Sequence, residues 1–426
     1  MKSVSIVKAA LGGGAAILLA GLVAAGPAAQ ATTGGTVPCQ SSALIAAINA
    51  ANSNGGARIN LASWCTYHLT KASSPNAMLG DTGLPVITSR ITLNGFHTTI
   101  AGNASTFRIL MVTGTGKLTL QGLTITGGNT PGPGGGIFNL EGTLTVNHST
   151  VTGNASAGGM MSAGGGIASG TLGTGPLGTT TLNFSQVSDN TTSGSAGGIL
   201  NHAGTLILNF SQVTGNTAAG GGGGIASGTG GSGGPGASQL FVNFSQVDGN
   251  TSNGGPMAGA GGISNGGTAS IKSSVVAGNT APGAAGGGIL NHGVMTITLS
   301  QINANNAPPD SAGDPGMGGG IANINLGQVA PGAVNGGILT ITASQIRGNT
   351  ASGQGGGIVE ATITATGVAP GGALTLTLSQ VTGNTAGSGG GIFAVPGSPV
   401  TLKLTLVAKN TPDNCAPPGS VTACKN

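Results

Sequence analysis

From about Gly134 onward, the chain repeats one pattern of apolar and polar positions. Each copy has a glycine cluster that leads into isoleucine, then a run of alternating apolar and polar residues, then valine or isoleucine followed three residues later by asparagine. Nine copies can be followed, at spacings of about 25 to 45 residues, which is the usual period of repeat architectures. The pattern therefore predicts a solenoid in which each copy forms one coil.

Two positions set the register of this repeat. The isoleucines after the glycines are expected to form one continuous interior column: Ile137, Ile167, Ile199, Ile225, Ile263, Ile289, Ile321, Ile358 and Ile392. The closing asparagines are expected to form a ladder whose amides satisfy turn backbone groups in adjacent coils, because asparagine tolerates left-handed backbone conformations. These asparagines are Asn154, Asn190, Asn216, Asn250, Asn279, Asn305, Asn349, Asn384 and Asn410.

The alternating run predicts a β-strand, because its period is two. Counted back from the valine or isoleucine, the residues five and three positions earlier are mostly apolar and are expected to face inward. By this prediction Phe184, Phe210 and Phe244 form an aromatic stack inside the solenoid. The intervening residues, such as Asn147 and Asn183, are expected to face outward.

A single copy is too small to fold alone. It buries about four aliphatic side chains, each worth roughly 1.5 to 3 kcal/mol, whereas ordering about 25 residues costs roughly 1 to 2 kcal/mol for each backbone unit. We therefore expect parallel coils about 4.8 Å apart, in which like residues lie over one another.

The repeat resembles the right-handed parallel β-helix of the pectin-lyase-like proteins. Its Gly-Gly-Ile and Val-x-x-Asn elements are similar to the GGAI and FxxN repeats of polymorphic outer membrane proteins, with Val or Ile in place of Phe. The likeness covers the chain from about Leu84 to Asn410 and implies an all-β fold, a single-stranded right-handed parallel β-helix. Because pectate lyases and polygalacturonases share this fold, the resemblance also implies polysaccharide lyase or glycoside hydrolase as an alternative function.

The chain divides into four segments. Residues 1–31 combine a basic start, an apolar centre and the sequence Ala-Gln-Ala, which predicts a secretory signal peptide. Residues 32–83 are expected to form an N-terminal cap, with a helix from Ser41, its N-cap, to Asn52, because an open solenoid end would expose the core. Residues 84–410 contain the β-helix of about 11 coils, on the order of 50 Å long, and residues 411–426 a C-terminal loop closed by a disulfide.

Four cysteines flank the repeats in two local pairs. Three pairings are possible, and proximity in the sequence favours Cys39 with Cys65 and Cys415 with Cys424. Oxidised pairs are expected outside the cell, which agrees with a secreted or cell-surface protein. A zinc site is the alternative, although neither pair has CxxC spacing or a histidine cluster nearby.

Charged residues are scarce, with 8 acidic and 12 basic among 426. No lysine or arginine cluster is interleaved with aromatic residues, which argues against nucleic-acid binding. Glycoside hydrolysis by the usual route needs two carboxylates a few ångströms apart, and a lyase needs a basic residue, usually with calcium held by several acids. Asp189 and Asp248 are expected to face opposite ways, so the sequence shows no convergent acid and base cluster and predicts neither a cofactor nor a metal.

Single residues offer further candidates for chemistry. Asp310 and Asp314 form a close acidic pair that could hold calcium, with solvated loop charge as the alternative. His202 and His292 lie three coils apart, too far for a shared metal, and His148 is expected to be a core or strand-end histidine. The serines two positions before the valine or isoleucine recur too regularly for a nucleophile and are expected to bond to the backbone: Ser149, Ser185, Ser211, Ser245, Ser274, Ser300, Ser344 and Ser379.

Two surface features complete the set of hypotheses. Outward threonine pairs resemble those of ice-binding proteins, which leaves ice binding as an alternative: Thr296 and Thr298, Thr340 and Thr342, and Thr375 and Thr377. Four coils carry longer segments at the same point, residues 168–178, 226–238, 322–337 and 359–372, which are expected to form one flexible binding edge. The sequence favours a secreted, monomeric, non-catalytic binding or structural element, with extracellular polysaccharide or a cell-wall component as its expected partner.

Overall fold

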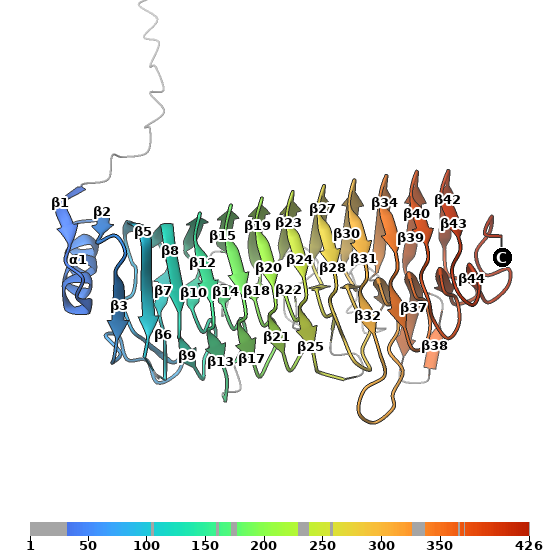
Figure 1. The fold of residues 1–426 in the computed structure, drawn as a ribbon, viewed down its shortest axis with the longest axis horizontal. Coiled ribbons are helices and arrows are strands. Elements are labelled where there is room, and N and C mark those ends of the chain that lie inside the picture. Colours follow the sequence, from blue (N-terminus) through green and yellow to red (C-terminus); the bar gives the residue numbers. More distant parts are fainter. Residues whose placement is uncertain are drawn as a thin grey trace, which may run out of the picture.

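The computed structural model describes residues 32–103, 106–158, 162–171, 177–228, 238–255, 259–325, 337–364, 367–369 and 371–425. These residues form one helix, α1 (Ser41–Ser53), and strands β1 to β44. The strands wind into one elongated stack of coils, with the helix at one end and the C-terminal loop at the other (Figure 1). The chain is therefore a parallel β-helix, as the repeat predicts, whereas the predicted signal peptide lies outside the described residues.

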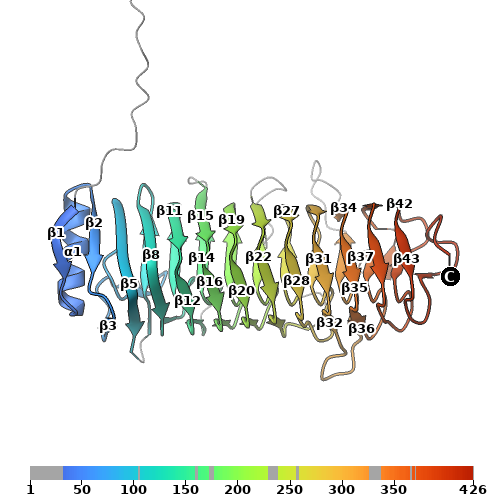
Figure 2. The ribbon, with the colours of Figure 1, turned by 45° about the horizontal axis from the view of Figure 1, so that its top comes forward.

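The first face of the stack contains the alternating runs, which pair in parallel from coil to coil (Figure 2). Its strands are β1 (Thr32–Val37), β2 (Gly56–Leu61), β5 (Arg90–Gly102), β8 (Lys117–Thr126), β11 (Thr143–Asn147), β15 (Gly178–Asn183), β19 (Gly204–Asn209), β23 (Gln239–Asn243), β27 (Thr268–Lys272), β30 (Val294–Thr298), β34 (Ile338–Thr342), β39 (Ala373–Thr377) and β42 (Val400–Lys403).

The second face follows the first after a sharp corner. Because β5 and β8 run through this corner, both faces belong to a single 23-stranded sheet. The other strands of the second face are β3 (Thr66–Leu69), β12 (Thr150–Thr152), β16 (Gln186–Ser188), β20 (Gln212–Thr214), β24 (Gln246–Asp248), β28 (Val275–Ala277), β31 (Gln301–Asn303), β35 (Gln345–Arg347), β40 (Gln380–Thr382) and β43 (Leu406–Ala408).

The third face contains the glycine-isoleucine segments and is a separate 12-stranded sheet. Its strands are β7 (Leu110–Thr113), β10 (Ile137–Leu140), β14 (Ile167–Gly170), β18 (Ile199–His202), β22 (Ile225–Ser227), β26 (Ile263–Asn265), β29 (Ile289–Asn291), β33 (Ile321–Asn325), β37 (Ile358–Thr364), β41 (Ile392–Ala394), β44 (Cys415–Ala416) and β38 (Gly367–Ala369), which is antiparallel to β37.

Short strands complete the coils. Between the second and third faces these are β9 (Asn129–Thr130), β13 (Ala155–Ser156), β17 (Thr191–Thr192), β21 (Thr217–Ala218), β25 (Thr251–Ser252), β32 (Asn306–Ala307) and β36 (Thr350–Ala351). Near the N-terminal end, β4 (Asp81–Thr82) pairs with β6 (Phe107–Arg108).

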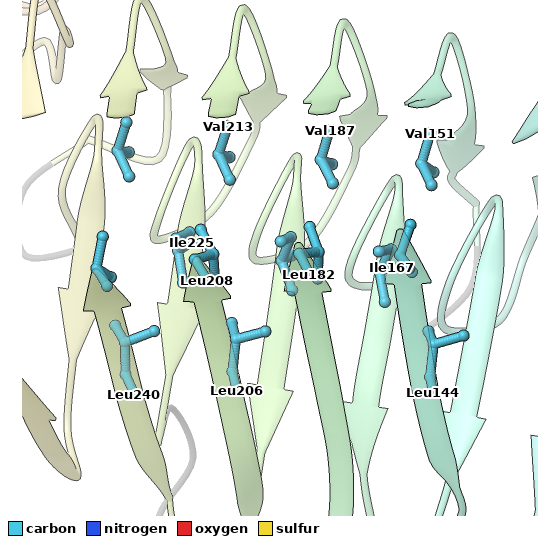
Figure 3. Close-up of a cluster of buried hydrophobic side chains, with 14 of the residues drawn as sticks. Leu144, Val151, Ile167, Leu182, Val187, Leu206, Leu208, Val213, Ile225 and Leu240 are labelled. Carbon is cyan, nitrogen blue, oxygen red and sulfur yellow. The ribbon is translucent and has the colours of Figure 1, made fainter. Parts of the chain in front are cut away.

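The interior confirms the predicted isoleucine column. All nine isoleucines have no exposed surface. Each of the first eight pairs in register with the isoleucine of the next coil, as Ile167 does with Ile199, and the last, Ile392, pairs with Cys415. Leucines and valines of the first and second faces pack against this column and repeat from coil to coil, as Leu206, Leu208 and Val213 show in one coil (Figure 3).

The prediction that the phenylalanines face inward is wrong. Phe184, Phe210 and Phe244 are about half exposed, at 56%, 52% and 51%. They lie at the corner between the first and second faces, where the backbone adopts a left-handed conformation, with φ near +50°. Because one left-handed residue turns the chain, the alternation of the strand stops there, and the corner side chain points outward.

The glycine cluster is explained by close approach of the backbone. In the coil that contains β22, Gly222 has a φ of +73°. A Cβ atom at Gly223 would lie 2.4 Å from the carbonyl oxygen of Gly261 in the next coil, and one at Gly224 would lie 2.9 Å from Asn250 Nδ2. Both distances are shorter than real Cβ contacts, so larger residues at these positions would push adjacent coils apart.

The two ends of the stack are closed differently. Helix α1 packs Leu44, Ile48 and Ala51 over the first coils, with Gln40 rather than the predicted Ser41 as its N-cap. The C-terminal end is covered by the loop that contains Val421 and a disulfide, and the last strands, β42 and β43, pair with no further strand in the described part of the chain. The exposed side chains of this last coil include Lys403 and Lys409.

Both disulfides join the predicted partners, Cys39 with Cys65 and Cys415 with Cys424. No helix in the described residues has the length and apolar character needed to cross a membrane.

Candidate functional site

Every coil turns from the first to the second face at one left-handed residue, which we call the corner residue. Its φ lies between +46° and +66°. From the N-terminal end, the corner residues are Trp64, His97, Gly122, His148, Phe184, Phe210, Phe244, Ser273, Leu299, Ala343, Leu378 and Leu404. Because all of them point away from the interior, they form a line along one edge of the β-helix.

Four consecutive corner residues form a stack of rings, which we call the aromatic column: His148, Phe184, Phe210 and Phe244. Their ring centroids are 5.2, 5.0 and 5.0 Å apart, and adjacent ring planes differ by only 4 to 8°. The sequence therefore predicted the stacking of the phenylalanines correctly and their side of the sheet wrongly. His148 was expected in the core or at a strand end; it directly follows β11, at the strand end, and is exposed as the first ring of this column.

The corner conformation is unfavourable for these residues. A left-handed backbone costs a non-glycine residue roughly 1 to 2 kcal/mol, and Gly122 shows that glycine also occupies a corner. Stacking of each aromatic pair returns about 0.5 to 1.5 kcal/mol. Because every coil uses the same left-handed corner, the backbone alone does not set these positions apart. Exposed aromatic side chains contribute little to the core, and exposed apolar clusters are typical of binding sites.

Amide side chains border the aromatic column on both sides. On the first face, the Nδ2 groups of Asn183, Asn209 and Asn243 each donate to the Oδ1 atom of the asparagine one coil earlier, at 2.9, 2.9 and 3.1 Å. On the second face, Gln186 and Gln212 begin successive strands and pair in register. The column is thus an apolar ridge between two rows of neutral amides.

A groove of about 410 Å³ lies between the aromatic column and the glutamines. It is lined by His148, Ser149, Thr150, Phe184, Ser185, Gln186, Phe210 and Gln212. None of these side chains is acidic, and none is lysine or arginine. The groove therefore combines ring edges with hydroxyl and amide groups, which can both donate and accept hydrogen bonds.

The buried asparagines form the chain of hydrogen bonds that the sequence suggested. From Asn154 to Asn384, the Nδ2 group of each donates to the Oδ1 atom of the next, at 2.9 to 3.0 Å. At the C-terminal end, Asn410 donates to Asn414. We call this the buried asparagine ladder, and its complete burial makes it a structural element rather than a ligand site.

A second buried polar row, two residues after each isoleucine except Ile392, was missed by the sequence analysis. Its members are Asn139, Ser169, Asn201, Ser227, Asn265, Asn291, Asn323 and Glu360. Asn265 donates to Asn291 at 2.8 Å, Asn291 to Asn323 at 2.7 Å and Asn323 to Glu360 at 2.6 Å. Side chains two positions apart in a strand face the same side, so the inward isoleucine could have been used to predict that these side chains also face inward.

Glu360 is the most strongly perturbed acid in the described residues. Burial raises its pKa to about 8, against the lowering effect of the hydrogen bond from Asn323. A raised pKa is a feature of catalytic acids, but Glu360 has no exposed surface, and its carboxylate lies so close to Gly371 that a Cβ atom there would collide with it. We interpret it as a protonated member of the polar row.

Arg108 is the corresponding buried cation. Its guanidinium donates to the carbonyl oxygens of Leu79, Gly80 and Pro133, and burial lowers its pKa to about 10, although the charge of Asp81 acts in the opposite direction. These contacts fasten two loops of the first coils together and leave the cation without access to a ligand.

The remaining acids do not form a reaction centre in the described residues. Burial raises the pKa of Asp248, and a hydrogen bond from Thr214 lowers it. Asp310 Oδ1 accepts the backbone N–H groups of Ala312 and Asp314, so this carboxylate stabilises its own turn. No three histidine, cysteine, aspartate or glutamate residues come close enough together in the described part to hold a metal ion.

The other predicted residues have structural positions. His202 ends β18 and His292 follows β29, with β22 and β26 between them, and burial lowers the pKa of His292. The serine row bonds to the backbone as expected, because Ser211 Oγ accepts the N–H of Ser185 and donates to Asn209 O.

The threonine pairs of three coils lie in register, as Thr296, Thr340 and Thr375 show. The tips of the longer segments, which were expected to bind, lie outside the described residues.

No known protein-family model matches the chain, and no curated protein matches it. Two solved structures are similar in fold, both A-modules of mannuronan C-5 epimerases from Azotobacter vinelandii. The AlgE4 module is 13% identical, with 86% of this chain and 91% of that chain covered and a TM-score of 0.45. The AlgE6 module is 14% identical, with 89% and 95% covered and a TM-score of 0.37. Neither likeness indicates what this chain binds.

Proposed function

We propose that the protein is a secreted, non-catalytic β-helix that binds extracellular polysaccharide through the aromatic column. The observation that carries this proposal is the column itself: stacked, half-exposed rings at strained corner positions, bordered by amides. Sugar rings present apolar C–H faces and hydroxyl groups, so a ridge of aromatic rings between hydrogen-bonding rows suits them chemically. Flexible amides on both sides can follow the hydroxyls of different sugars.

Secretion is part of this proposal. The two disulfides support an oxidising compartment, and residues 1–31 have the pattern of a secretory signal. Membership of the pectin-lyase-like superfamily, and kinship of the repeats with those of polymorphic outer membrane proteins, are proposed on the sequence motifs alone.

Substitution of Phe210 by alanine is expected to weaken retention on the bound polysaccharide about tenfold, equivalent to about 1.4 kcal/mol. Phe210 lies in the middle of the aromatic column, so its loss interrupts both stacks. Alanine is compatible with the corner, because Ala343 already occupies one with a φ of +49°. The measurement is pull-down of the mature protein by insoluble cell-wall polysaccharides.

Leu378→Ala is the matched control, because Leu378 is also a corner residue, 58% exposed, but lies outside the aromatic column. Its retention should equal that of the unmodified protein. Equal losses in both variants would show that any apolar corner residue suffices, and retention unchanged by Phe210→Ala would remove the column from the binding site.

The non-catalytic part of the proposal has its own test. Incubation of the mature protein with polygalacturonate, with and without calcium, is expected to leave the polymer length unchanged, since the described acids are dispersed or buried. The measurement is reducing-end release together with size-exclusion chromatography. Depolymerisation would instead favour the lyase or hydrolase alternative.

A further inference from the structure

The sequence Asn-Phe-Ser-Gln occurs three times at the corner, in residues 183–186, 209–212 and 243–246. In each copy, the asparagine belongs to the first face, the phenylalanine is the corner residue, the serine points inward, and the glutamine begins the second face. Three successive coils therefore offer the same exposed groups: an amide, a ring edge and a second amide.

These groups repeat by translation along the axis of the β-helix. The rings of Phe184, Phe210 and Phe244 are spaced by 5.0 Å and are nearly parallel, and the asparagine amides are joined to one another at every step. A ligand that places one unit on every copy must have units spaced by the same distance. One hexose unit of an extended glycan chain has about this length, and because successive β-1,4-linked hexoses are flipped, the amide rows on the two sides of the column would meet the same hydroxyls on alternate units.

The ends of the motif limit the length of such a site. After the third copy, Lys272, Ser273 and Val275 replace the asparagine, phenylalanine and glutamine. Before the first copy, His148 continues the column, and Gly122 then takes the corner position. The repeated surface thus extends from His148 to Phe244, over four coils.

The side chains that line the groove favour an uncharged ligand over a charged one. Its lining contains amides, hydroxyls, ring edges and one imidazole, without a carboxylate, lysine or arginine. An anionic glycan would lose the hydration of its carboxylates here without gaining a fixed cationic partner. A neutral glycan would exchange water for amide hydrogen bonds at each coil.

We propose that the Asn-Phe-Ser-Gln copies and His148 bind an uncharged, unbranched glycan, extended parallel to the axis of the β-helix, with one sugar unit for each coil. This inference rests on the proposed polysaccharide-binding function and specifies its ligand.

The test is calorimetric titration of the full mature protein with neutral oligosaccharides of two to six units, in β-1,4-linked glucose, mannose and xylose series. In at least one series, affinity is expected to rise about tenfold from the disaccharide to the tetrasaccharide, about 1.4 kcal/mol, and to level off beyond four units. Phe210→Ala should abolish the dependence on length, because it divides the column into two short parts, whereas Leu378→Ala should preserve it.

Phe210→Leu removes the aromatic ring but keeps an apolar side chain. Leucine is compatible with the corner, because Leu299 and Leu378 already occupy corner positions. This variant is expected to keep the fold, checked by circular dichroism, and to lose the gain in affinity with length. Oligogalacturonates of the same lengths serve as the anionic probe and should bind at least about tenfold more weakly than the best neutral series.

Three results would overturn the inference. If affinity did not depend on oligosaccharide length in any neutral series, the placement of one sugar unit on each coil would be refuted. Stronger binding of oligogalacturonates would refute the preference for neutral chains. Neither result would contradict the proposed function. Self-association in sedimentation velocity that disappears with Phe210→Ala would assign the column to a second copy of the chain. Loss of all glycan retention, by contrast, would reject the proposed function itself.

Discussion

Replacement of Asn216 by alanine is expected to lower the free energy of unfolding by about 4 kcal/mol or more, because it leaves several buried groups unpaired at about 1 to 3 kcal/mol each. Asn216 has no exposed surface. Its Nδ2 donates to Val187 O, Thr214 O and Asn250 Oδ1, and its Oδ1 accepts two N–H groups from Asn190. Alanine removes all of these bonds and offers no path for water.

Asn209→Ala is the matched control for this prediction. Asn209 belongs to the same coil and to a similar row of amides, but its side chain is half-buried on the first face. Because water can replace the hydrogen-bond partners of Asn209, the free energy of unfolding is expected to fall by less than about 1 kcal/mol. Urea midpoints by circular dichroism measure both effects, and equal shifts would mean that the buried asparagine ladder contributes no more than the surface row.

Glu360→Gln is expected to stabilise the protein at alkaline pH. The pKa of Glu360 is raised from its usual value of 4.5 to about 8 in the folded state. Below pH 4.5 the carboxyl of Glu360 is protonated in both the folded and the unfolded protein, so its titration does not lower the free energy of unfolding. Between pH 4.5 and about 8 only the unfolded state releases this proton, so stability falls by about 1.4 kcal/mol for each pH unit. The fall amounts to about 5 kcal/mol by pH 8 and stops above that value.

Glutamine removes this dependence because it stays neutral and can still accept the hydrogen bond from Asn323. The two proteins should therefore have similar urea midpoints at pH 4, and the variant should be the more stable at pH 8. Parallel profiles for Glu360→Gln and the unmodified protein would contradict the raised pKa.

The parts of the fold that depend on strict repetition could be predicted from the sequence. Ile225 occupies the same place in its coil as eight other isoleucines, and stacking in register follows from that repetition. The buried asparagine at Asn216 was recognisable for the same reason. The burial of these side chains and their hydrogen bonds between coils follow from the residue type that repeats at each position, so they could be predicted from the sequence.

The candidate site was missed because it depends on one backbone angle. Extending the two-residue alternation through Phe210 places it inside, whereas a left-handed φ at that residue places it outside. Bulky residues rarely adopt this conformation, so no residue of the pattern indicated a turn there. The pairing of glutamines beside the column also appears only after the strands are folded around the corner.

The last coil forms the C-terminal edge of the β-helix. Strands β42 and β43 leave unpaired N–H and C=O groups at the C-terminal edge, which is the kind of template that recruits further chains into fibres. Lys403 stands in the row that earlier coils fill mostly with asparagine or threonine and once with lysine, at Lys272, and Lys409 takes the place of a turn glycine. A second molecule docking through the same edge would bring like charges together, so these two lysines are expected to oppose pairing of the C-terminal ends of two molecules.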